Sequence, residues 1–373
     1  MKIESLKLRE IIDSRTNPTV EAEINGSLGR APAGASTGRH EAEAFVPEHL
    51  DAAEKKMQKL VGKDLSQEEF DQELRKIDET EKFEELGSAA IAASFAFKNS
   101  NGFNHTNKFP LPLSNVIGGG EHGGNTSIQE FLVLPVNASS FREAVETNTK
   151  IYQELKDRYA MKIKGMNDEG ALITSMDDEQ TLKALKKVAD KYEARIGLDM
   201  AASEYYEDGE YKISSMHQTL EGDDYLDFVQ KLIDEFDLVY VEDPFDQDDF
   251  HYHAKLTSKN PEVLICGDDL FVTQEKRLQE GVDNRAGNSL IVKPNQVGTV
   301  SDAKETVQLA KENDYVPVIS HRSGETCDAT ISDLALEWEL PVIKAGIADI
   351  RIAKLNQLIR HEDRQENPEI NGF

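Results

Sequence analysis

The chain has 373 residues, of which 38% are hydrophobic, and 70 acidic against 42 basic side chains give it a formal net charge of -28. Such a charge repels nucleic acid and anionic membranes, so we expect neither as a partner. The apolar runs are short and broken by charge, which argues against a membrane-spanning helix, and two cysteines make no disulfide framework. The N-terminal sequence MKIESLKLREIID lacks the apolar core of a secretion signal, so we expect a cytoplasmic protein.

The N-terminal part predicts a small α+β unit. Residues 19–24, TVEAEI, alternate like a half-buried strand, and the following stretch rich in glycine and alanine predicts a loop. Residues 51–99 predict helix. Within them Ser66 and Glu69 have the spacing of a capping box, in which each side chain bonds the other residue's backbone.

The composition changes over residues 99–115, where NSNGFNHTNKFPLPLSN is polar and contains glycine and proline. We expect a domain boundary within this stretch, near residue 108. The prediction is an N-terminal α+β domain over 1–108 and a catalytic domain over 109–373.

Beyond this boundary, short and nearly all-apolar runs recur, as expected for strands buried on both faces. Each run ends in a polar residue, and these residues are Asp199, Glu242, Asp268, Lys293, His321 and Lys344. From Glu242 onward the steps between them are 26, 25, 28 and 23 residues. One strand with one crossover helix occupies about 25 residues, so the spacing predicts repeated β/α units.

Amphipathic stretches separate most of these runs; SDAKETVQLAKEND, for example, predicts a helix with Ser301 as its N-cap. A doubly wound open sheet would show the same alternation, but it concentrates function at one switch point. Six polar strand ends favour a (β/α)8-type barrel, in which the carboxyl ends of all strands face one pocket.

The charges at these strand ends sort by sign. Asp199, Glu242 and Asp268 come first, and converging buried carboxylates need a cation to offset their desolvation. An all-oxygen set favours Mg²⁺ over zinc; three solvated acids are the simpler alternative. The basic residues that follow are Lys293, His321, Arg322 and Lys344. They could hold an anionic substrate, and a lysine among cations could act as a general base. The alternative for any one lysine is a salt bridge.

Two glycine-rich stretches add acid–base candidates. GGGEHGGNTSIQEF contains His122, Gln129 and Glu130, and NDEG places Asp168 and Glu169 in a loop. Two adjacent carboxyl groups share protons, which raises one pKa and makes a general acid. A metal-bound carboxylate, a lysine base and a carboxylic acid indicate proton abstraction next to a carboxylate, with the metal stabilising an ene-diolate and acid-assisted loss of a leaving group.

Taken together and in this order, the motifs resemble the enolase family of phosphopyruvate hydratases over nearly the whole chain. They include DSRTNPTVEAEI, GASTGRHEA, GGEHGGN, QEF, DEG, GLDMAASEYY, VEDPF, GDDLFVT, VKPNQVGT, SHRSGET and AKLNQLIR. The resemblance implies a small α+β domain before a modified barrel whose second strand is antiparallel. It also implies reversible dehydration of 2-phosphoglycerate to phosphoenolpyruvate in glycolysis and gluconeogenesis, with two Mg²⁺ per site.

The resemblance assigns roles to individual residues. Lys293 is similar to the base that takes the C2 proton, and Glu169 to the acid that assists departure of the C3 hydroxyl, with Glu130 as its partner. The implied metal ligands are Asp199, Glu242 and Asp268 for the first ion and Ser36 for the second. The implied substrate contacts are His122, Gln129, His321, Arg322, Ser323 and Lys344. We expect a homodimer or higher homo-oligomer.

Two alternatives stay open. A different acid dehydratase or cycloisomerase on the same barrel would use a pair of lysines such as Lys162 and Lys164, although we interpret this pair as surface charge. A catalytically silent binding protein is the other alternative. Retention of every residue type needed for chemistry argues against it.

Overall fold

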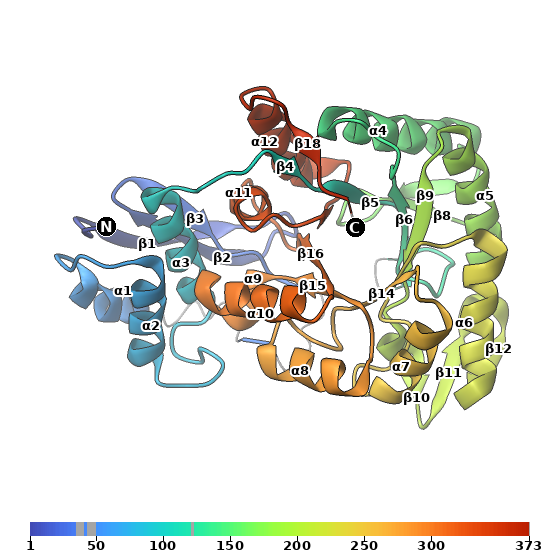
Figure 1. The fold of residues 1–373 in the computed structure, drawn as a ribbon, viewed down its shortest axis with the longest axis horizontal. Helices are drawn as coiled ribbons and strands as arrows, with labels where there is room; N and C mark the ends of the chain where they lie inside the picture. The colour runs from blue at the N-terminus through green and yellow to red at the C-terminus, as the bar shows by residue number, and fades with distance from the viewer. Residues whose placement is uncertain (35–40, 43–49, 121–122, 373) are drawn as a thin grey trace.

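The computed structural model describes residues 1–34, 41–42, 50–120 and 123–372. Two predicted site residues, Ser36 and His122, lie outside these ranges. The described residues form an N-terminal unit of one sheet and three helices, which packs against a closed barrel (Figure 1).

The sheet of the N-terminal unit is an antiparallel meander of three strands covered by α3. Its elements are β1 (Leu6–Ile12), β2 (Pro18–Ile24), β3 (Ser27–Arg30), α1 (Leu50–Met57), α2 (Gln67–Asp78) and α3 (Ser88–Asn101). The predicted strand is therefore confirmed as β2. The helical stretch predicted over 51–99 consists of α1, α2 and α3, and the chain turns between them, with Glu79 in the left-handed region after α2.

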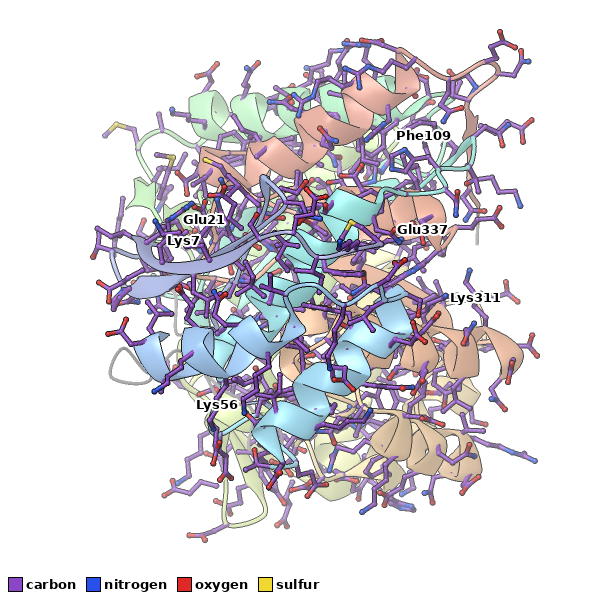
Figure 2. The ribbon with its side chains drawn as sticks, turned by 90° about the vertical axis from the view of Figure 1, so that its left-hand side faces the viewer. Lys7, Glu21, Lys56, Phe109, Lys311 and Glu337 are labelled. Carbon is purple, nitrogen blue, oxygen red and sulfur yellow. The ribbon has the colours of Figure 1, made fainter. Side chains whose placement is uncertain are left out.

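The predicted capping box begins α2. The Ser66 hydroxyl accepts a bond from the Glu69 backbone N–H, and the Glu69 carboxylate accepts one from the Ser66 N–H at 2.8 Å. Figure 2 views this unit, with Lys7 and Glu21 on its strands and Lys56 on α1. Charged side chains are abundant on this outer side of the molecule.

The barrel has eight strands in a closed ring. In ring order they are β5 (Leu111–Gly118), β6 (Glu130–Leu134), β9 (Arg195–Asp199), β13 (Tyr240–Glu242), β14 (Leu264–Gly267), β15 (Ser289–Val292), β16 (Val316–Ser320) and β17 (Val342–Lys344). Strand β17 pairs with β5 and closes the ring. The second strand, β6, is antiparallel to both neighbours while the other pairs of the ring are parallel, which confirms the predicted modified barrel.

Smaller strands extend this framework. β8 (Leu172–Thr174) joins β5, β7 (Ile163–Met166) pairs with β8, and a separate three-stranded sheet follows β9. That sheet consists of β10 (Tyr206–Glu207), β11 (Glu210–Ile213) and β12 (Gln218–Glu221). Lys164 lies in β7 and Lys162 directly before it. Both side chains are exposed, in agreement with their interpretation as surface charge.

The helices surround the barrel (Figure 1). They are α4 (Phe141–Arg158), α5 (Asp178–Lys191), α6 (Gly222–Phe236), α7 (Phe250–Lys259), α8 (Glu275–Asn284), the short α9 (Pro294–Val297), α10 (Val300–Glu312), α11 (Thr330–Glu337) and α12 (Ile352–Glu362). No helix among the described residues combines the length and the apolar character needed to cross a membrane.

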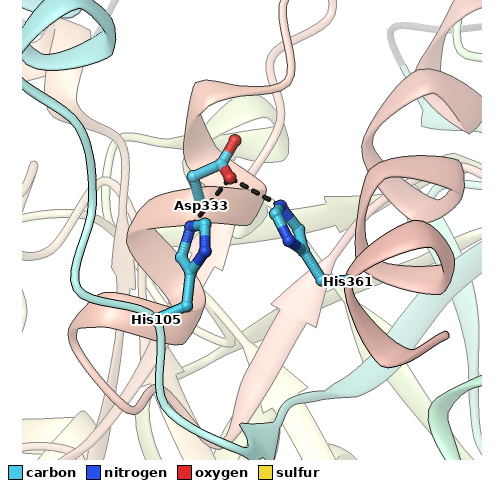
Figure 3. A group of neighbouring side chains, drawn as sticks. All are labelled: His105, Asp333 and His361. Atoms are coloured by element: carbon cyan, nitrogen blue, oxygen red, sulfur yellow. Dashed lines mark hydrogen bonds and ion pairs between the residues drawn. The ribbon is translucent and has the colours of Figure 1, made fainter. Parts of the chain in front are cut away.

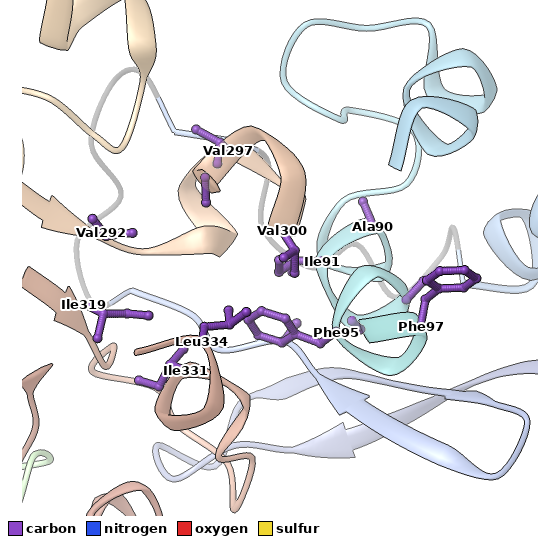
Figure 4. Packing of buried hydrophobic residues seen from close by; sticks show 14 of the residues in the cluster. Ala90, Ile91, Phe95, Phe97, Val292, Val297, Val300, Ile319, Ile331 and Leu334 are labelled. Atoms are coloured by element: carbon purple, nitrogen blue, oxygen red, sulfur yellow. The ribbon is translucent and has the colours of Figure 1, made fainter. Parts of the chain in front are cut away.

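An apolar cluster joins the N-terminal unit to the barrel, and we call it the junction core. Figure 4 shows Phe95 of α3 pointing toward Ile331 and Leu334 of α11, with Ile91 beside Val300 of α10. These residues belong to one buried cluster that runs through both parts of the chain. The two parts therefore share a hydrophobic core.

A buried carboxylate lies at the same junction. Asp71 of α2 accepts bonds from the Ser94 hydroxyl at 2.7 Å and from the Ser301 hydroxyl at 2.6 Å, and burial raises the pKa of Asp71 to about 6. The N-cap of α10 is Thr299, whose side chain accepts a bond from Asp302 N–H. The prediction of Ser301 as the cap is wrong, because its hydroxyl is directed to Asp71 instead.

The polar stretch between the two parts runs from the end of α3 to β4 (Lys108–Phe109), which pairs in parallel with β18 (Glu369–Ile370) near the C-terminus. The domain boundary near residue 108 stays a prediction.

Candidate active site

The carboxyl ends of the parallel barrel strands meet around one cavity. Because β6 runs the opposite way, its first residue, Glu130, pairs with Asp199, the last residue of β9. Glu242, at the end of β13, pairs with Asp199 from the other side. The register of three neighbouring strands therefore gathers three carboxylates, those of Glu130, Asp199 and Glu242.

Most of the predicted site residues line this cavity. Those present in its wall are Gln129, Glu130, Glu169, Asp199, Asp268, Lys293, His321, Arg322, Ser323 and Lys344. Glu242 is fully buried and reaches the same group through Lys344. Ser36 and His122 lie outside the described residues, so their predicted roles stay predictions.

Lys344 is the centre of the acidic half. Its Nζ lies 2.7 Å from Glu242 Oε2, 2.9 Å from Asp199 Oδ2 and 3.0 Å from Glu130 Oε2. Burial lowers the pKa of Lys344, but the three carboxylates outweigh burial and raise it well above its usual value. One ammonium facing three carboxylates leaves an excess of negative charge. Burial and Asp199 accordingly raise the pKa of Glu242 to about 8.

Lys293 forms an ion pair with Asp268 in the basic half of the cavity. Burial lowers the pKa of Lys293, but Asp268 together with Glu242 more than offsets this and the net pKa is raised. From the sequence we expected neighbouring cations and a nearby metal ion to disfavour the ammonium. Without a metal ion these acids keep the ammonium favoured despite Arg322 and Lys344, and the effect of cations and metal together stays a prediction. The same pair lowers the pKa of Asp268 despite its burial.

A cluster of neutral and protonatable groups faces the lysines. Single ligand atoms of Glu130, Glu169 and His321 lie within 4.8 Å of one another. Burial raises the pKa of Glu130 well above its ordinary value and lowers that of His321 well below. Asn115 donates a bond to Glu169 at 3.1 Å and holds its carboxylate in place. This corner of the cavity can therefore hold a proton on a carboxyl group.

The other acid of the DEG motif has a different position. Asp168 forms an ion pair with Arg15 at 3.1 Å, and its backbone carbonyl accepts a bond from Arg351 at 3.0 Å. Asp168 is half-buried, whereas Glu169 is buried in the cavity wall. The carboxylate close to Glu169 is therefore Glu130, and the motif contributes one acid to the cavity.

Sequence reasoning missed two residues that hold the basic wall. Glu41 pairs with Arg322 through both guanidinium nitrogens, at 2.7 and 3.2 Å. The fully buried Arg351 donates to the carbonyls of Arg322 and Ser323 and fixes their backbone. Glu41 follows two basic residues in the motif GASTGRHEA, and this position was a signal in the sequence that could have identified it. No sequence signal identified Arg351, because its partners are backbone atoms.

Comparison with known proteins identifies the family. A family model described as the enolase N-terminal domain matches residues 3–109, and one described as the enolase C-terminal TIM barrel domain matches residues 106–370. The enolase of Natronomonas pharaonis is 44% identical over 396 residues, covering 96% of this chain and 98% of its own. The chain belongs to the enolase family.

More distant enolases match to the same extent. The enolase of Methanosphaera stadtmanae is 41% identical over 409 residues, with 98% of each chain covered. That of Archaeoglobus fulgidus is 38% identical over 399 residues, with 99% of each covered. Enolases are phosphopyruvate hydratases, so the family places this chain among the lyases.

The acids of this enolase fit a hard divalent cation by their chemistry. Asp199, Glu242 and Asp268 offer only oxygen donors, and Glu242 Oε1 is buried without a hydrogen-bond partner. The three acids do not form a group whose ligand atoms all lie within 4.8 Å of one another; among the described residues such an acidic group is Asp243, Asp268 and Asp269. Lysines occupy the intervening positions, with Lys344 between Asp199 and Glu242 and Lys293 on Asp268.

Asp243 and Asp269 were not predicted as site residues, although the motifs VEDPF and GDDLFVT contain them. Asp243 accepts bonds from the backbone N–H groups of Asp268 at 3.0 Å and Asp269 at 2.8 Å. It therefore positions the loop after β14, and both Asp243 and Asp269 line the cavity.

Proposed function

We propose that this enolase interconverts 2-phosphoglycerate and phosphoenolpyruvate in glycolysis and gluconeogenesis. The observation that carries the proposal is the single cavity in which Lys293 stands in the same wall as Glu169, Glu130 and Arg322. A base, an acid and an anion-binding group in one cavity are what this dehydration requires. Relatives named enolase support the same reaction.

In the proposed reaction Lys293 acts as the base. With Asp268 engaged as a proposed metal ligand instead of as its ion-pair partner, Lys293 would be a neutral amine that takes the proton from C2 of the substrate. The electron pair left behind delocalises into the adjacent carboxylate. Lys293 reaches the cavity from the end of β15, and its backbone N–H bonds the Thr273 hydroxyl at 2.9 Å. This rigid placement at a strand end suits a group that must meet one substrate atom.

Glu169 acts as the general acid. The electron pair forms the C2–C3 double bond as the C3–O bond breaks, and the hydroxyl leaves as water with a proton from Glu169. Glu130 is its partner, because burial raises the pKa of Glu130 and so favours a proton in this corner. His321, Gln129 and Lys344 contact the substrate.

Arg322 and Ser323 hold the substrate phosphate. In the structure Arg322 is bound by Glu41, so phosphate must replace Glu41 as its partner. The planar guanidinium suits either anion because both accept two parallel bonds. Ser36 and His122 complete the proposed contacts.

Asp199, Glu242 and Asp268 are the proposed Mg²⁺ ligands, with Ser36 for a second ion. When bound, Mg²⁺ supplies positive charge for a substrate carboxylate that becomes more negative as the C2 proton leaves. The protein would act in the cytoplasm, on a small phosphorylated acid, as a homodimer or higher oligomer.

The test is an assay of phosphoenolpyruvate formation from 2-phosphoglycerate with and without Mg²⁺. We expect Mg²⁺-dependent conversion by the wild type and a loss on the order of 10³-fold or more in Lys293→Ala. Glu169→Gln should also lose dehydration but retain exchange of the C2 proton with solvent, because exchange needs only the base. Lys162→Ala is the matched control, since this exposed lysine lies outside the cavity.

Two results would contradict the proposal. One is turnover of an unphosphorylated sugar acid with none of 2-phosphoglycerate, especially if it depended on Lys162 and Lys164. The other is a folded wild-type protein that turns over neither substrate, which would favour the catalytically silent alternative. Circular dichroism of each variant establishes that the fold is intact.

A further inference from the structure

A second cluster of side chains suited to metal binding lies outside the wall of the active-site cavity. His105 belongs to the polar stretch before β4, Asp333 to α11 and His361 to the last turn of α12 (Figure 3). None of the three lines the cavity described above. The geometry points to a binding site for one transition-metal ion, of the Zn²⁺ type, held by His105, Asp333 and His361.

The donor atoms already converge. His361 Nε2 lies 2.7 Å from Asp333 Oδ1, His105 Nε2 lies 2.9 Å from the same oxygen, and the three atoms fit within 4.8 Å. Tetrahedral zinc with bonds near 2.0 Å keeps its ligand atoms about 3.3 Å apart. A rise of about half an ångström in each nitrogen–oxygen separation would therefore admit the ion, which is within the range of small side-chain rotations.

The state of His105 is an independent observation in favour of a metal. Its buried Nε2 lies 2.9 Å from Asp333 Oδ1 and has no well-aligned hydrogen bond among the described residues. The nitrogen is thus directed toward the cluster, where Asp333 is its close contact. The three side chains are largely buried, with 20%, 11% and 11% of His105, Asp333 and His361 exposed, which leaves an edge for ion entry.

The donor types select the class of metal. Two imidazole nitrogens and one carboxylate oxygen suit Zn²⁺ and its neighbours Co²⁺ and Ni²⁺, whereas Mg²⁺ prefers oxygen donors alone. The carboxylates of the active-site cavity offer oxygen donors alone. We therefore expect Mg²⁺ to bind in the active-site cavity and Zn²⁺ to bind at the histidine cluster. Gln357 lies beside the cluster, with Nε2 2.9 Å from His361 Nε2, and a water can fill the fourth position.

Such an ion would fasten three segments that are distant in sequence. His105 precedes the barrel, while α11 and α12 are its last helices, and Thr106 already bonds the Leu336 carbonyl at 3.0 Å. Binding to the folded state alone raises stability by mass action. The site would therefore be structural, acting on stability rather than on the reaction.

The experiment is a Zn²⁺ titration of the full-length protein in excess Mg²⁺, which keeps the oxygen sites filled. The variants are His361→Asn and His105→Asn. The control is His217→Asn, because His217 is exposed and has a φ of 54°, which asparagine tolerates. Equilibrium dialysis counts bound Zn²⁺, and thermal unfolding reports stability.

We expect wild type and His217→Asn to bind one Zn²⁺ more than either cluster variant. They should also gain several degrees in unfolding temperature that the cluster variants do not. With Co²⁺ the same pair should develop the intense visible absorption of a low-coordinate imidazole site, and neither cluster variant should. Equal Zn²⁺ stoichiometry and equal thermal shift in all four proteins would overturn the proposal, as would a Co²⁺ spectrum unaffected by either substitution.

Discussion

The cavity and the junction core are buried to the same degree but composed in opposite ways. Lys344 in the cavity is 3% exposed and Phe95 in the junction core is 2% exposed. Burial of Phe95 lowers the free energy of folding, because apolar surface leaves water. Burial of Lys344 and its acids costs desolvation energy that their mutual attraction has to offset. The buried charges of the cavity therefore serve the reaction and not the stability of the fold. The free energy that offsets their desolvation comes from apolar regions such as the junction core.

The largest loss of stability is expected when the positive charge that offsets the buried carboxylates of the active-site cavity is removed. Lys344→Met leaves Glu130, Asp199 and Glu242 buried without their shared cation. We expect a loss of about 5 kcal/mol in the free energy of unfolding without divalent metal, together with loss of activity. Urea denaturation in EDTA measures the stability.

Mg²⁺ sharpens this test. If these acids hold a metal, added Mg²⁺ should restore more stability to Lys344→Met than it adds to the wild type, because the ion replaces the missing charge. A variant as stable as the wild type in EDTA would show that the cavity charges do not depend on Lys344.

The junction core should respond in stability alone. Phe95→Ala opens a cavity among Ile331, Leu334 and Val300, and we expect a loss of about 4 kcal/mol in the free energy of unfolding. Activity per folded molecule should stay within about twofold of the wild type, because the residues that line the active-site cavity are untouched. Phe95→Leu is the control and should cost much less. A large change in KM with little change in stability would contradict the separation of the two regions.

The smallest effect concerns a buried histidine whose desolvation is only partly offset by the nearby carboxylates of Asp249 and Asp246. His253 on α7 donates from Nδ1 to the Asp249 carbonyl at 2.7 Å, its Nε2 is unpartnered, and burial lowers the pKa of His253 to about 4. As pH falls from 6.5 to about 4, the unfolded chain takes up a proton that the folded chain does not. Stability should therefore fall by about 3 kcal/mol over this window.

Chemical denaturation of wild type and His253→Asn at a series of pH values measures this component. Asparagine can donate the same bond to Asp249 but does not titrate, so the difference between the two proteins isolates the histidine. The two curves should converge at low pH. Curves that stay parallel would show that His253 has the same pKa in the folded and the unfolded state.

The barrel was predictable because its signals are local and repeated. Each buried strand is a short apolar run, and a polar residue at its end, such as Asp199 or Lys293, shows where the strand reaches the pocket. The capping box at Ser66 was predictable for the same reason, since its two partners are three residues apart. The antiparallel β6 came from the family resemblance rather than from periodicity.

The partners of the site residues were not predictable in this way. The pairing of Arg322 with Glu41 joins residues that are 281 positions apart, and Arg351 binds carbonyls that any residue could supply. The Ser301 error has the same origin, because its hydroxyl meets Asp71 from 230 positions away. The direction of the Lys293 pKa likewise depends on which charge lies nearest.

The sequence by itself determined the strand–helix rhythm, the sorting of acids and bases along successive strands, and the family, because hydrophobic periodicity and motif order are properties of neighbouring residues. Only the tertiary structure decided which charge meets which. The ring closure of β17 on β5 and the reversal of β6 bring Lys344 onto Glu130 and Asp199, and the packing of α11 and α12 brings Asp333 and His361 to His105. Electrostatic energy depends on distances through space, and these are fixed only when the barrel closes.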